Sequence, residues 1–371
     1  MPKSKRKHRR QGKRQRRHQR RRQKVLKYTY EPITADYTTR MLTIHNGAYR
    51  DQLTGDLEMA KLDDCLPWKA LSYAWGTTTT YSRIKIGKRF IKISNNLDGA
   101  LRRLRCKNDE GPSGPGFRLW VDQICINQEN LEERSQQVQL MYNIYEKAEK
   151  VLVWLGPDPD KIAEKATFAL RQVASLDDTQ ISRILREGLG SFEPTIELEH
   201  LKTLLDRPWF RRLWVAQEVG TDTPAEFYWG QECMSFDILY KACNALYNKL
   251  LVEIDAANLR CATPILLYKS FVEKAETTEP QHADFTYQLY QFNKASRKKC
   301  LDPKDRVFAL LGHYSARIGP DKHLIMQADY SSTETAVYRE LAIRALTDAK
   351  STFILNAVEH KGKQHPHPPH I

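Results

Sequence analysis

The fold is decided by residues 118–156, which read RLWVDQICINQENLEERSQQVQLMYNIYEKAEKVLVWLG. This stretch opens with an apolar run at residues 119–126 and closes with a second at residues 151–155. Between the runs, apolar residues recur at spacings of three and four, which is typical of one face of a helix: Val138, Met141, Tyr145 and Ala148. The stretch therefore predicts a strand, a helix and a second strand.

Both apolar runs are nearly continuous, as in strands that are covered on both faces. A right-handed crossover makes two such strands parallel. Because ligands bind beyond the carboxyl ends of parallel strands, the sequence predicts a ligand site at residues 122–128 and after Leu155. Asp122 interrupts the first run, and an acid inside an apolar strand needs a partner, for which Arg134 and Arg212 are the candidates.

The charge of the chain is concentrated at one end. The 371 residues carry a formal net charge of +14, and residues 1–27 hold 15 Lys/Arg and no acid. This segment is predicted to be a disordered basic tail because it has almost no apolar side chain to bury. It indicates either nuclear import or contact with a nucleic acid or another polyanion, or else a solvated polycation without a specific role.

The cysteine count indicates a reducing compartment. The seven cysteines are odd in number and form no Cys-x-x-Cys pair. We therefore expect a cytoplasmic protein, nuclear if the tail directs import. No metal site is expected, because histidines and cysteines do not cluster at ligand spacing. The apolar runs are also too short to span a membrane.

The remaining elements follow from the same patterns. Strands are expected at residues 28–33, 40–44, 68–76, 83–86, 89–93 and 226–229, with a hairpin turn at Gly87-Lys88. Helices are expected from Asn95 or Asn96, and over residues 161–174, 179–187, 197–205, 236–249, 259–296 and 333–348. On a helix over residues 210–219, Trp214 and Glu218 would share a face.

Several separated stretches together resemble one family. They are residues 30–33 (YEPI), 70–76 (ALSYAWG), 119–128 (LWVDQICINQ), 207–210 (RPWF) and 302–312 (DPKDRVFALLG). In this order they resemble the fungal heterokaryon-incompatibility (HET) domain. The resemblance implies a HET domain over residues 28–358, with a core at about 68–230, a helical part at 231–358 and a disordered His/Pro tail at 359–371.

The resemblance also carries expectations about fold and role. HET domains are implicated in fungal non-self recognition and regulated cell death, and they are distantly similar to Toll/interleukin-1-receptor (TIR) domains. The expected fold is α/β, with a flavodoxin-like central parallel sheet, flanking helices, an added hairpin and helical insertions. Its first three strands would be residues 71–75, 119–126 and 151–155.

Catalytic TIR domains cleave the nicotinamide–ribose bond of NAD and carry a Trp-x-x-x-Glu pattern, which Trp214 and Glu218 match. The resemblance implies that Glu218 is the catalytic acid, stabilising positive charge on the ribose. NAD is then the substrate, and no cofactor is required. Substrate-binding candidates near the strand ends are Tyr73, Trp75, Gly76, Asp122, Asn127 and Trp214.

Each assignment has a structural alternative. Glu218 can form an ion pair with Arg211 or Arg212, Trp214 can belong to the core, and Asp122 can be a buried anchor. Three functions follow: an NAD glycohydrolase, a non-enzymatic self-associating signalling module, or a nucleic-acid-associated protein targeted by its tail. The first two imply a homo-oligomer on activation and an unidentified partner or sensor protein.

Overall fold

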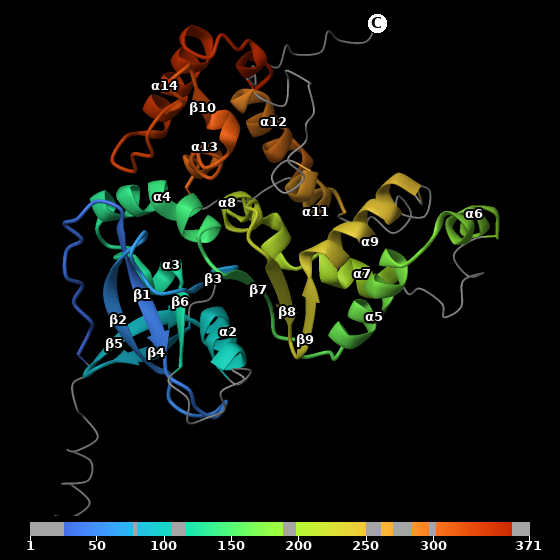
Figure 1. Cartoon of the computed structure of the whole chain (residues 1–371), viewed down its shortest axis with the longest axis horizontal. Coiled ribbons are helices and arrows are strands. Elements are labelled where there is room, and N and C mark those ends of the chain that lie inside the picture. Colours follow the sequence, from blue (N-terminus) through green and yellow to red (C-terminus); the bar gives the residue numbers. More distant parts are fainter. Residues whose placement is uncertain are drawn as a thin grey trace, which may run out of the picture.

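The computed structural model describes residues 26–76, 80–105, 116–187, 198–249, 261–269, 284–296 and 302–357. The two predicted disordered tails lie outside these ranges, apart from Leu26 and Lys27. A nine-stranded mixed sheet, in the order β5-β4-β2-β1-β6-β3-β7-β8-β9, forms the centre of the molecule (Figure 1). The strands are β1 Thr38–Ile44, β2 Thr54–Lys61, β3 Lys69–Tyr73, β4 Tyr81–Ile86, β5 Arg89–Ser94, β6 Phe117–Trp120, β7 Lys150–Gly156, β8 Ala225–Trp229 and β9 Glu232–Ser235.

Four neighbouring strands form a parallel core within this sheet. β3 pairs in parallel with both β6 and β7, and β7 pairs in parallel with β8. Numbered by their order in the chain, these four strands have the spatial order 2-1-3-4, which is the order of flavodoxin-like sheets. The predicted α/β fold is therefore confirmed, and the strands at the two ends of residues 118–156 are parallel with β3 between them.

Antiparallel strands extend the parallel core on both sides. β1 pairs antiparallel with β6, and β9 pairs antiparallel with β8. The predicted hairpin is confirmed as β4 and β5, which are antiparallel and joined at Gly87, whose φ of +56° suits glycine. It reaches the sheet through a parallel pairing of β4 with β2.

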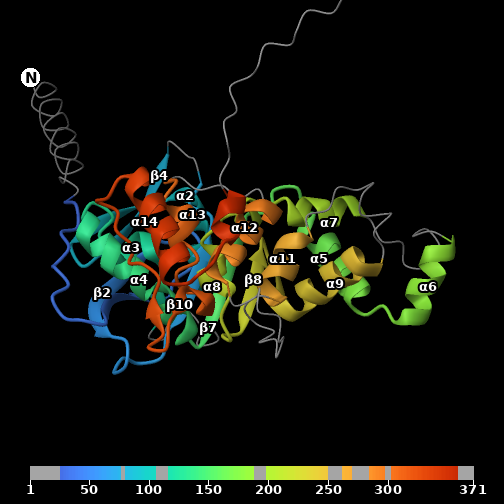
Figure 2. The same cartoon turned by 90° about the horizontal axis from the view of Figure 1, so that it is seen from above.

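Helices cover the two faces of the sheet and extend beyond its β9 edge. α4 and α8 lie on the face toward α12, α13 and α14, whereas α2 lies on the opposite face (Figure 1). A second view shows α5, α7 and α9 as a group beyond β8 (Figure 2). The helices are α2 Asn95–Arg105, α3 Asp122–Cys125, α4 Leu131–Glu146, α5 Ala163–Ala174, α6 Asp178–Glu187, α7 Leu198–Leu205, α8 Val215–Val219, α9 Phe236–Lys249, α11 Ala262–Leu267, α12 Phe285–Ser296, α13 Asp305–Phe308 and α14 Glu334–Thr347, with 3-10 turns at Pro208–Arg211, Tyr314–Ala316 and Phe353–Ala357.

Local chemistry explains the two elements that frame the core. In β7 all residues from Val151 to Gly156 are buried, because the strand lies inside the sheet between β3 and β8 and is packed against α2 and the Pro208–Arg211 turn. Asn130 caps the start of α4, and its side chain accepts hydrogen bonds from the backbone N–H groups of Glu132 and Glu133. Its buried face includes Val138, Met141 and Tyr145, which the periodicity predicts.

Two predicted strands were wrong, and two observed strands were not predicted. The strand expected at residues 119–126 ends at Trp120, and Asp122 opens the single helical turn α3 because its carboxylate accepts the N–H of Gln123. No strand forms at residues 28–33, although Lys27 just before them makes an isolated bridge to Phe90. β2 and β9 were not predicted at all. None of the helices in the described ranges is long and apolar enough to cross a membrane.

Candidate functional site: an acid network at the ends of β3 and β6

Two predicted site acids meet where β3 and β6 end. Glu218 of α8 lies against Ser72, the last residue but one of β3. Asp122, two residues beyond the end of β6, contacts Tyr73 at the end of β3. The neighbouring parallel strands thus bring together side chains that are 96 positions apart in sequence, as expected at the carboxyl edge of a parallel core.

Glu218 is almost completely enclosed, with 1% of its surface exposed. Both nitrogens at the tip of Arg212 donate to it, Nη1 to Oε2 at 2.7 Å and Nη2 to Oε1 at 2.7 Å. Ser72 Oγ also donates to Oε2, and Ser72 in turn accepts from the indole N–H of Trp209 at 2.7 Å. Both carboxylate oxygens are therefore held, in the two-pronged geometry that makes an Arg–carboxylate pair strong.

The chain before α8 explains this pairing. A 3-10 turn at Pro208–Arg211 precedes Arg212, whose extended backbone redirects the chain into α8. Glu218 N donates to Trp214 O at 3.1 Å, so Trp214 and Glu218 are one helical turn apart, as their spacing predicts. Arg212 can therefore fold back along this turn and reach the Glu218 carboxylate.

Asp122 differs from Glu218 because it is only partly buried. Its Oδ1 accepts from Tyr73 Oη at 3.1 Å and its Oδ2 accepts from Trp75 Nε1 at 2.7 Å. Burial, and to a smaller extent the Glu218 charge, raise the pKa of Asp122 to about 6, although Arg212 opposes the shift. This acid can therefore exchange a proton near neutral pH.

Arg212 interacts electrostatically with both Glu218 and Asp122. Burial opposes its charge, but Glu218 and then Asp122 outweigh this effect and raise the pKa of the guanidinium. Asp122 itself is hydrogen-bonded by Tyr73 and Trp75, so Arg212 acts on it through space. The alternative partner Arg134 was wrong for Asp122: its guanidinium lies 3.7 Å from the ring centre of Tyr330 and 3.9 Å from Asp302.

Other predicted site residues lie around the network in different roles. Asn127 N donates to Glu133 at 2.7 Å, and Asn127 Oδ1 accepts from Glu129 N at 3.3 Å, so this residue turns the chain into α4. Gly76 is exposed and has a φ of +78°. Trp214 is partly buried and packs against the hydrophobic core.

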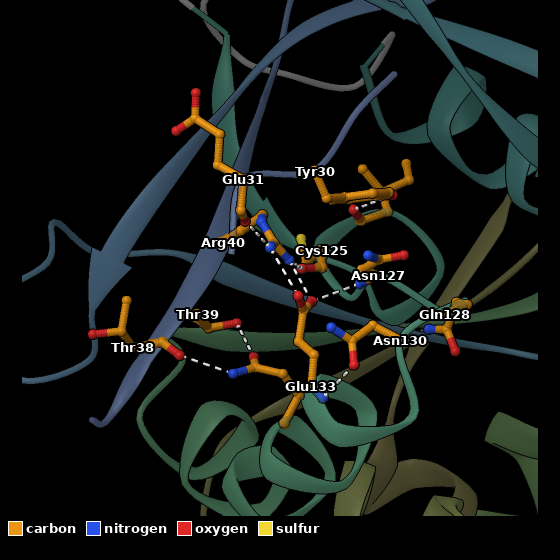
Figure 3. A network of polar contacts seen from close by, with 12 residues as sticks. Tyr30, Glu31, Thr38, Thr39, Arg40, Cys125, Asn127, Gln128, Asn130 and Glu133 are labelled. Atoms are coloured by element: carbon orange, nitrogen blue, oxygen red, sulfur yellow. Dashed lines mark hydrogen bonds and ion pairs between the residues drawn. The ribbon is translucent and has the colours of Figure 1, made fainter. Parts of the chain in front are cut away.

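A second polar network holds the end of α3 (Figure 3). Arg40 of β1 and Glu133 of α4 form a buried ion pair, with Nη1–Oε1 at 2.6 Å and Nη2–Oε2 at 3.0 Å. Arg40 also donates to the carbonyls of Cys125 at the end of α3 and of Glu31. The pair therefore joins β1, α3, α4 and the N-terminal segment.

The sequence alone assigned no role in the site to four residues that build these networks: Arg40, Ser72, Glu133 and Trp209. Ser72 carried a usable signal, because a hydroxyl inside an otherwise apolar strand needs a buried partner. No sequence signal indicates that Arg40 pairs with Glu133, since 93 positions separate them. Among the described residues, no group of three or more His, Cys, Asp or Glu side chains is arranged to hold a metal ion.

The fold and the site together define an α/β protein with a flavodoxin-like parallel core and a buried Arg–Glu pair beside a second, titratable acid. Residues 68–218 match the family model described as heterokaryon incompatibility protein (HET). The resemblance to that family is therefore confirmed over this span. The matched span begins just before β3 and ends on Glu218, so it contains both acids and Arg212.

A curated relative supports the same family. The chain is similar to "Heterokaryon incompatibility protein 6, OR allele" of Neurospora crassa, with 25% identity over 354 residues. The similarity covers 80% of this chain and 49% of that protein, so the chain spans about half the length of this relative. No solved structure matches the chain, and the predicted likeness to TIR domains stays a prediction.

Proposed function

We propose that this chain acts in heterokaryon incompatibility, the non-self response of filamentous fungi, through its HET domain. The match over residues 68–218 and the similarity to the Neurospora protein support this role. The same span holds the acid network, and no other described cluster of buried charges lies at the carboxyl ends of the parallel strands. We therefore take this network as the site through which the domain works.

The activity that we propose for the site is NAD glycohydrolysis on activation. The observation that carries it is the position of Glu218, one turn after Trp214 and against the carboxyl end of β3. Cleavage of the nicotinamide–ribose bond sends the bonding electrons to the nicotinamide nitrogen and leaves positive charge on the ribose. A carboxylate fixed beside that carbon stabilises the charge.

Asp122 supplies the second half of this proposal. Water must add to the ribose carbon and lose a proton, which gives ADP-ribose, nicotinamide and one proton in total. A general base works best when its pKa lies near the operating pH, and the pKa of Asp122 is raised to about 6. We assign Glu218 to charge stabilisation and Asp122 to proton acceptance, with Trp75 and Trp214 as candidate walls for the nicotinamide ring.

The resting structure supports control of this activity. Arg212 and Ser72 occupy both oxygens of Glu218, so a substrate reaches this acid only after Arg212 has moved away. A domain that destroys NAD must be silent until it is triggered. We therefore propose that activation, by self-association or by an unidentified partner protein, separates Arg212 from Glu218.

The closed geometry of Glu218 also favours one alternative. If the Arg212–Glu218 pair never opens, the network is a structural core, and the domain signals by self-association without chemistry. This reading explains the full burial of Glu218 as directly as the enzymatic one does. The two readings differ in whether NAD is consumed when the protein assembles.

The experiment measures nicotinamide release from NAD by the purified chain across a range of protein concentrations, with oligomer size recorded in parallel. The variant is Glu218→Gln. Its matched control is Glu226→Gln on β8, which removes an acid paired with Lys150 outside the network. We expect release by the parent chain and the control, and none by Glu218→Gln. Assembly without release by any of the proteins would favour the signalling module instead.

The basic tail enters the proposal as a targeting segment. Residues 1–27 hold 15 Lys/Arg, enough to bind a polyanion or to direct nuclear import. Deletion of these residues should move the protein between nucleus and cytoplasm and reduce the salt dependence of RNA binding, without changing nicotinamide release. Unchanged localisation and unchanged binding would identify the tail as a solvated polycation.

A further inference from the structure

The β4–β5 hairpin carries an unbalanced positive charge. Residues 81–94 hold five Lys/Arg and no acid, whereas Lys/Arg and Asp/Glu nearly balance in the chain beyond residue 27. All five of these cations are exposed, and no carboxylate of the described chain forms an ion pair with any of them. They are Arg83, Lys85, Lys88, Arg89 and Lys92.

Three of the cations lie together on the outer face of the hairpin. Side chains alternate along a strand, and the isoleucines of both strands are buried, so Arg83, Lys85 and Lys92 share the opposite, solvent-exposed face. Arg83 lies directly across from Lys92, and like charges in that position destabilise a sheet. A negatively charged partner on this face would relieve the repulsion.

Two aromatic side chains lie on the same outer face. Tyr81, at the start of β4, is 51% exposed, and the Lys92 ammonium lies 3.5 Å from its ring centre. Phe90 of β5 is partly buried and lies across from Lys85. An exposed ring among cations fits a nucleobase stacked on the ring with its phosphates on the cations. Because bases inside a duplex are stacked on each other, this arrangement favours a single strand.

The basic tail joins the domain beside this face. Residues 26–28 run alongside β5, where Phe90 N donates to Leu26 O and Tyr28 N donates to Phe90 O, both at 2.9 Å. This pairing is parallel, so residue 26 lies nearest the turn of the hairpin. Figure 1 shows the described chain beginning beside the hairpin at one end of the sheet. The 15 Lys/Arg of residues 1–27 are therefore attached next to the cations of the hairpin.

The alternative is that these cations only protect the edge of the sheet, since charged side chains on edge strands prevent aggregation. Arg83 and Lys85, however, belong to β4, which lies inside the sheet between β5 and β2. The two acids of the neighbouring strand β2, Asp56 and Glu58, are already bound by other side chains. Edge protection therefore does not account for the cations of β4.

We propose that the outer face of the β4–β5 hairpin binds single-stranded RNA: Arg83, Lys85 and Lys92 contact phosphates, and Tyr81 stacks on a base. RNA is the partner because its unpaired loops and ends present bases that are free to stack. The proposal is independent of the activity at Glu218. It extends the contact proposed for the basic tail to a surface of the folded domain. The hairpin variants below keep the tail, so either contact can fail alone.

The first test measures binding of the full chain to a single-stranded RNA across a range of salt concentrations. The hairpin variant combines Arg83→Gln, Lys85→Gln and Lys92→Gln. Its matched control removes the same charge at three exposed helix residues, by Lys165→Gln, Arg186→Gln and Arg339→Gln.

Each phosphate contact on a single strand contributes about 0.7 to the slope of log K against log salt concentration. We therefore expect the magnitude of this slope to fall by about 2 in the hairpin variant and to stay parental in the control. The hairpin variant should fold, because the substitutions are exposed and remove the repulsion between Arg83 and Lys92. Equal slopes in the two variants would overturn the proposal.

The second test concerns stacking. Tyr81→Leu removes the ring, and Phe168→Leu on α5 is the control, because Phe168 is also 51% exposed. We expect the affinity for single-stranded RNA to fall roughly tenfold in Tyr81→Leu and to stay parental in the control. The affinity for duplex RNA of the same length should not change in either variant.

The competing occupants are duplex RNA and an anionic membrane, the latter tested with phosphatidylserine vesicles. Parental binding of single-stranded RNA by Tyr81→Leu would overturn the stacking contact and, with it, the assignment to a single strand. A loss of vesicle or duplex binding in Tyr81→Leu equal to the loss of single-strand binding would also contradict the proposal, because the face would then bind polyanions without reading a free base.

Discussion

Two buried Arg–Glu pairs within the described part of the chain have the same two-pronged geometry and different surroundings. Arg40 and Glu133 have side chains that are 2% and 5% exposed, and each guanidinium nitrogen at the tip meets one carboxylate oxygen. The remaining bonds of this pair go to backbone groups: two carbonyls and the N–H of Asn127. The pair is balanced in charge and joins four segments of chain.

The Arg212–Glu218 pair is surrounded by further ionisable groups. Arg212 is hydrogen-bonded to Glu218 and interacts electrostatically with Asp122, so one guanidinium compensates two carboxylates. Tyr73 is bonded to Asp122, and burial raises the pKa of its phenol well above the ordinary value. The comparison shows that burial and two-pronged geometry do not distinguish the two pairs. We propose a site at Arg212–Glu218 because this pair has an additional acid and a titratable neighbour, and perturbed ionisable groups of this kind cluster at functional sites.

The largest effect on folding should come from breaking the balanced pair. Arg40→Met leaves Glu133 as a buried charge without its partner and removes the link between β1 and α4. We expect the free energy of unfolding to fall by about 3–5 kcal/mol. Urea denaturation measures it, and a loss below about 1 kcal/mol would show that Arg40 does not hold these segments together.

A smaller loss of stability should follow from Glu218→Gln. The amide oxygen still accepts from Arg212, whose side chain is 16% exposed and can also be solvated, and Asp122 remains nearby to balance its charge. We expect a loss of about 1–3 kcal/mol in urea denaturation. A loss as large as that of Arg40→Met would mean that both pairs stabilise the fold equally. That result would contradict the proposed difference between a structural pair and a site pair.

The titration of Asp122 should be visible in the pH dependence of stability. Because the pKa of Asp122 is raised from 3.8 to about 6, the folded chain binds this proton more tightly than the unfolded chain. The contribution of this group to stability is therefore most favourable below about pH 4 and falls as the pH rises to 6. Asp122→Asn should remove about 1–2 kcal/mol of that decline, after allowance for partial exposure.

The control for this pH experiment is Asp321→Asn, which changes an exposed acid. It should leave the slope between pH 4 and 6 as it is in the parent chain. Equal slopes in all three proteins would show that Asp122 titrates in the folded chain as it does in the unfolded one.

The smallest effect should come from an exposed pair. Lys27 and Glu129 lie 2.6 Å apart, but their side chains are 71% and 76% exposed. We expect Lys27→Ala to change the free energy of unfolding by less than about 0.5 kcal/mol, with that small effect lost in high salt. A loss above about 1 kcal/mol would show that the N-terminal segment is clamped at Lys27 as well as at Arg40.

Sequence reasoning succeeded where the physical cause is local. The apolar period of α4, the glycine turn between β4 and β5 and the one-turn spacing of Trp214 and Glu218 each depend on neighbours within a few residues. These patterns were sufficient to identify the parallel core and to place Trp214 and Glu218 on one turn of helix in the candidate site. They also brought Asp122 to the carboxyl end of that core.

The failures share a different cause. β6 stops at Trp120 because the Asp122 carboxylate captures the N–H of Gln123, a local bond that competes with the strand. The partners of Ser72 and Arg40 lie 146 and 93 positions away, so no local pattern identifies them. Arg134 was matched with Asp122 on charge alone, whereas the packing of Tyr330 places it elsewhere.

The most direct test of the central claim is nicotinamide release from NAD by the parent chain and by Glu218→Gln, at concentrations where both proteins have assembled to the same size. We expect the parent to release nicotinamide and the variant to release none, with both still folded. Equal release from the two proteins, or none from a fully assembled parent, would contradict the claim that the Arg212–Glu218 network is an enzyme site.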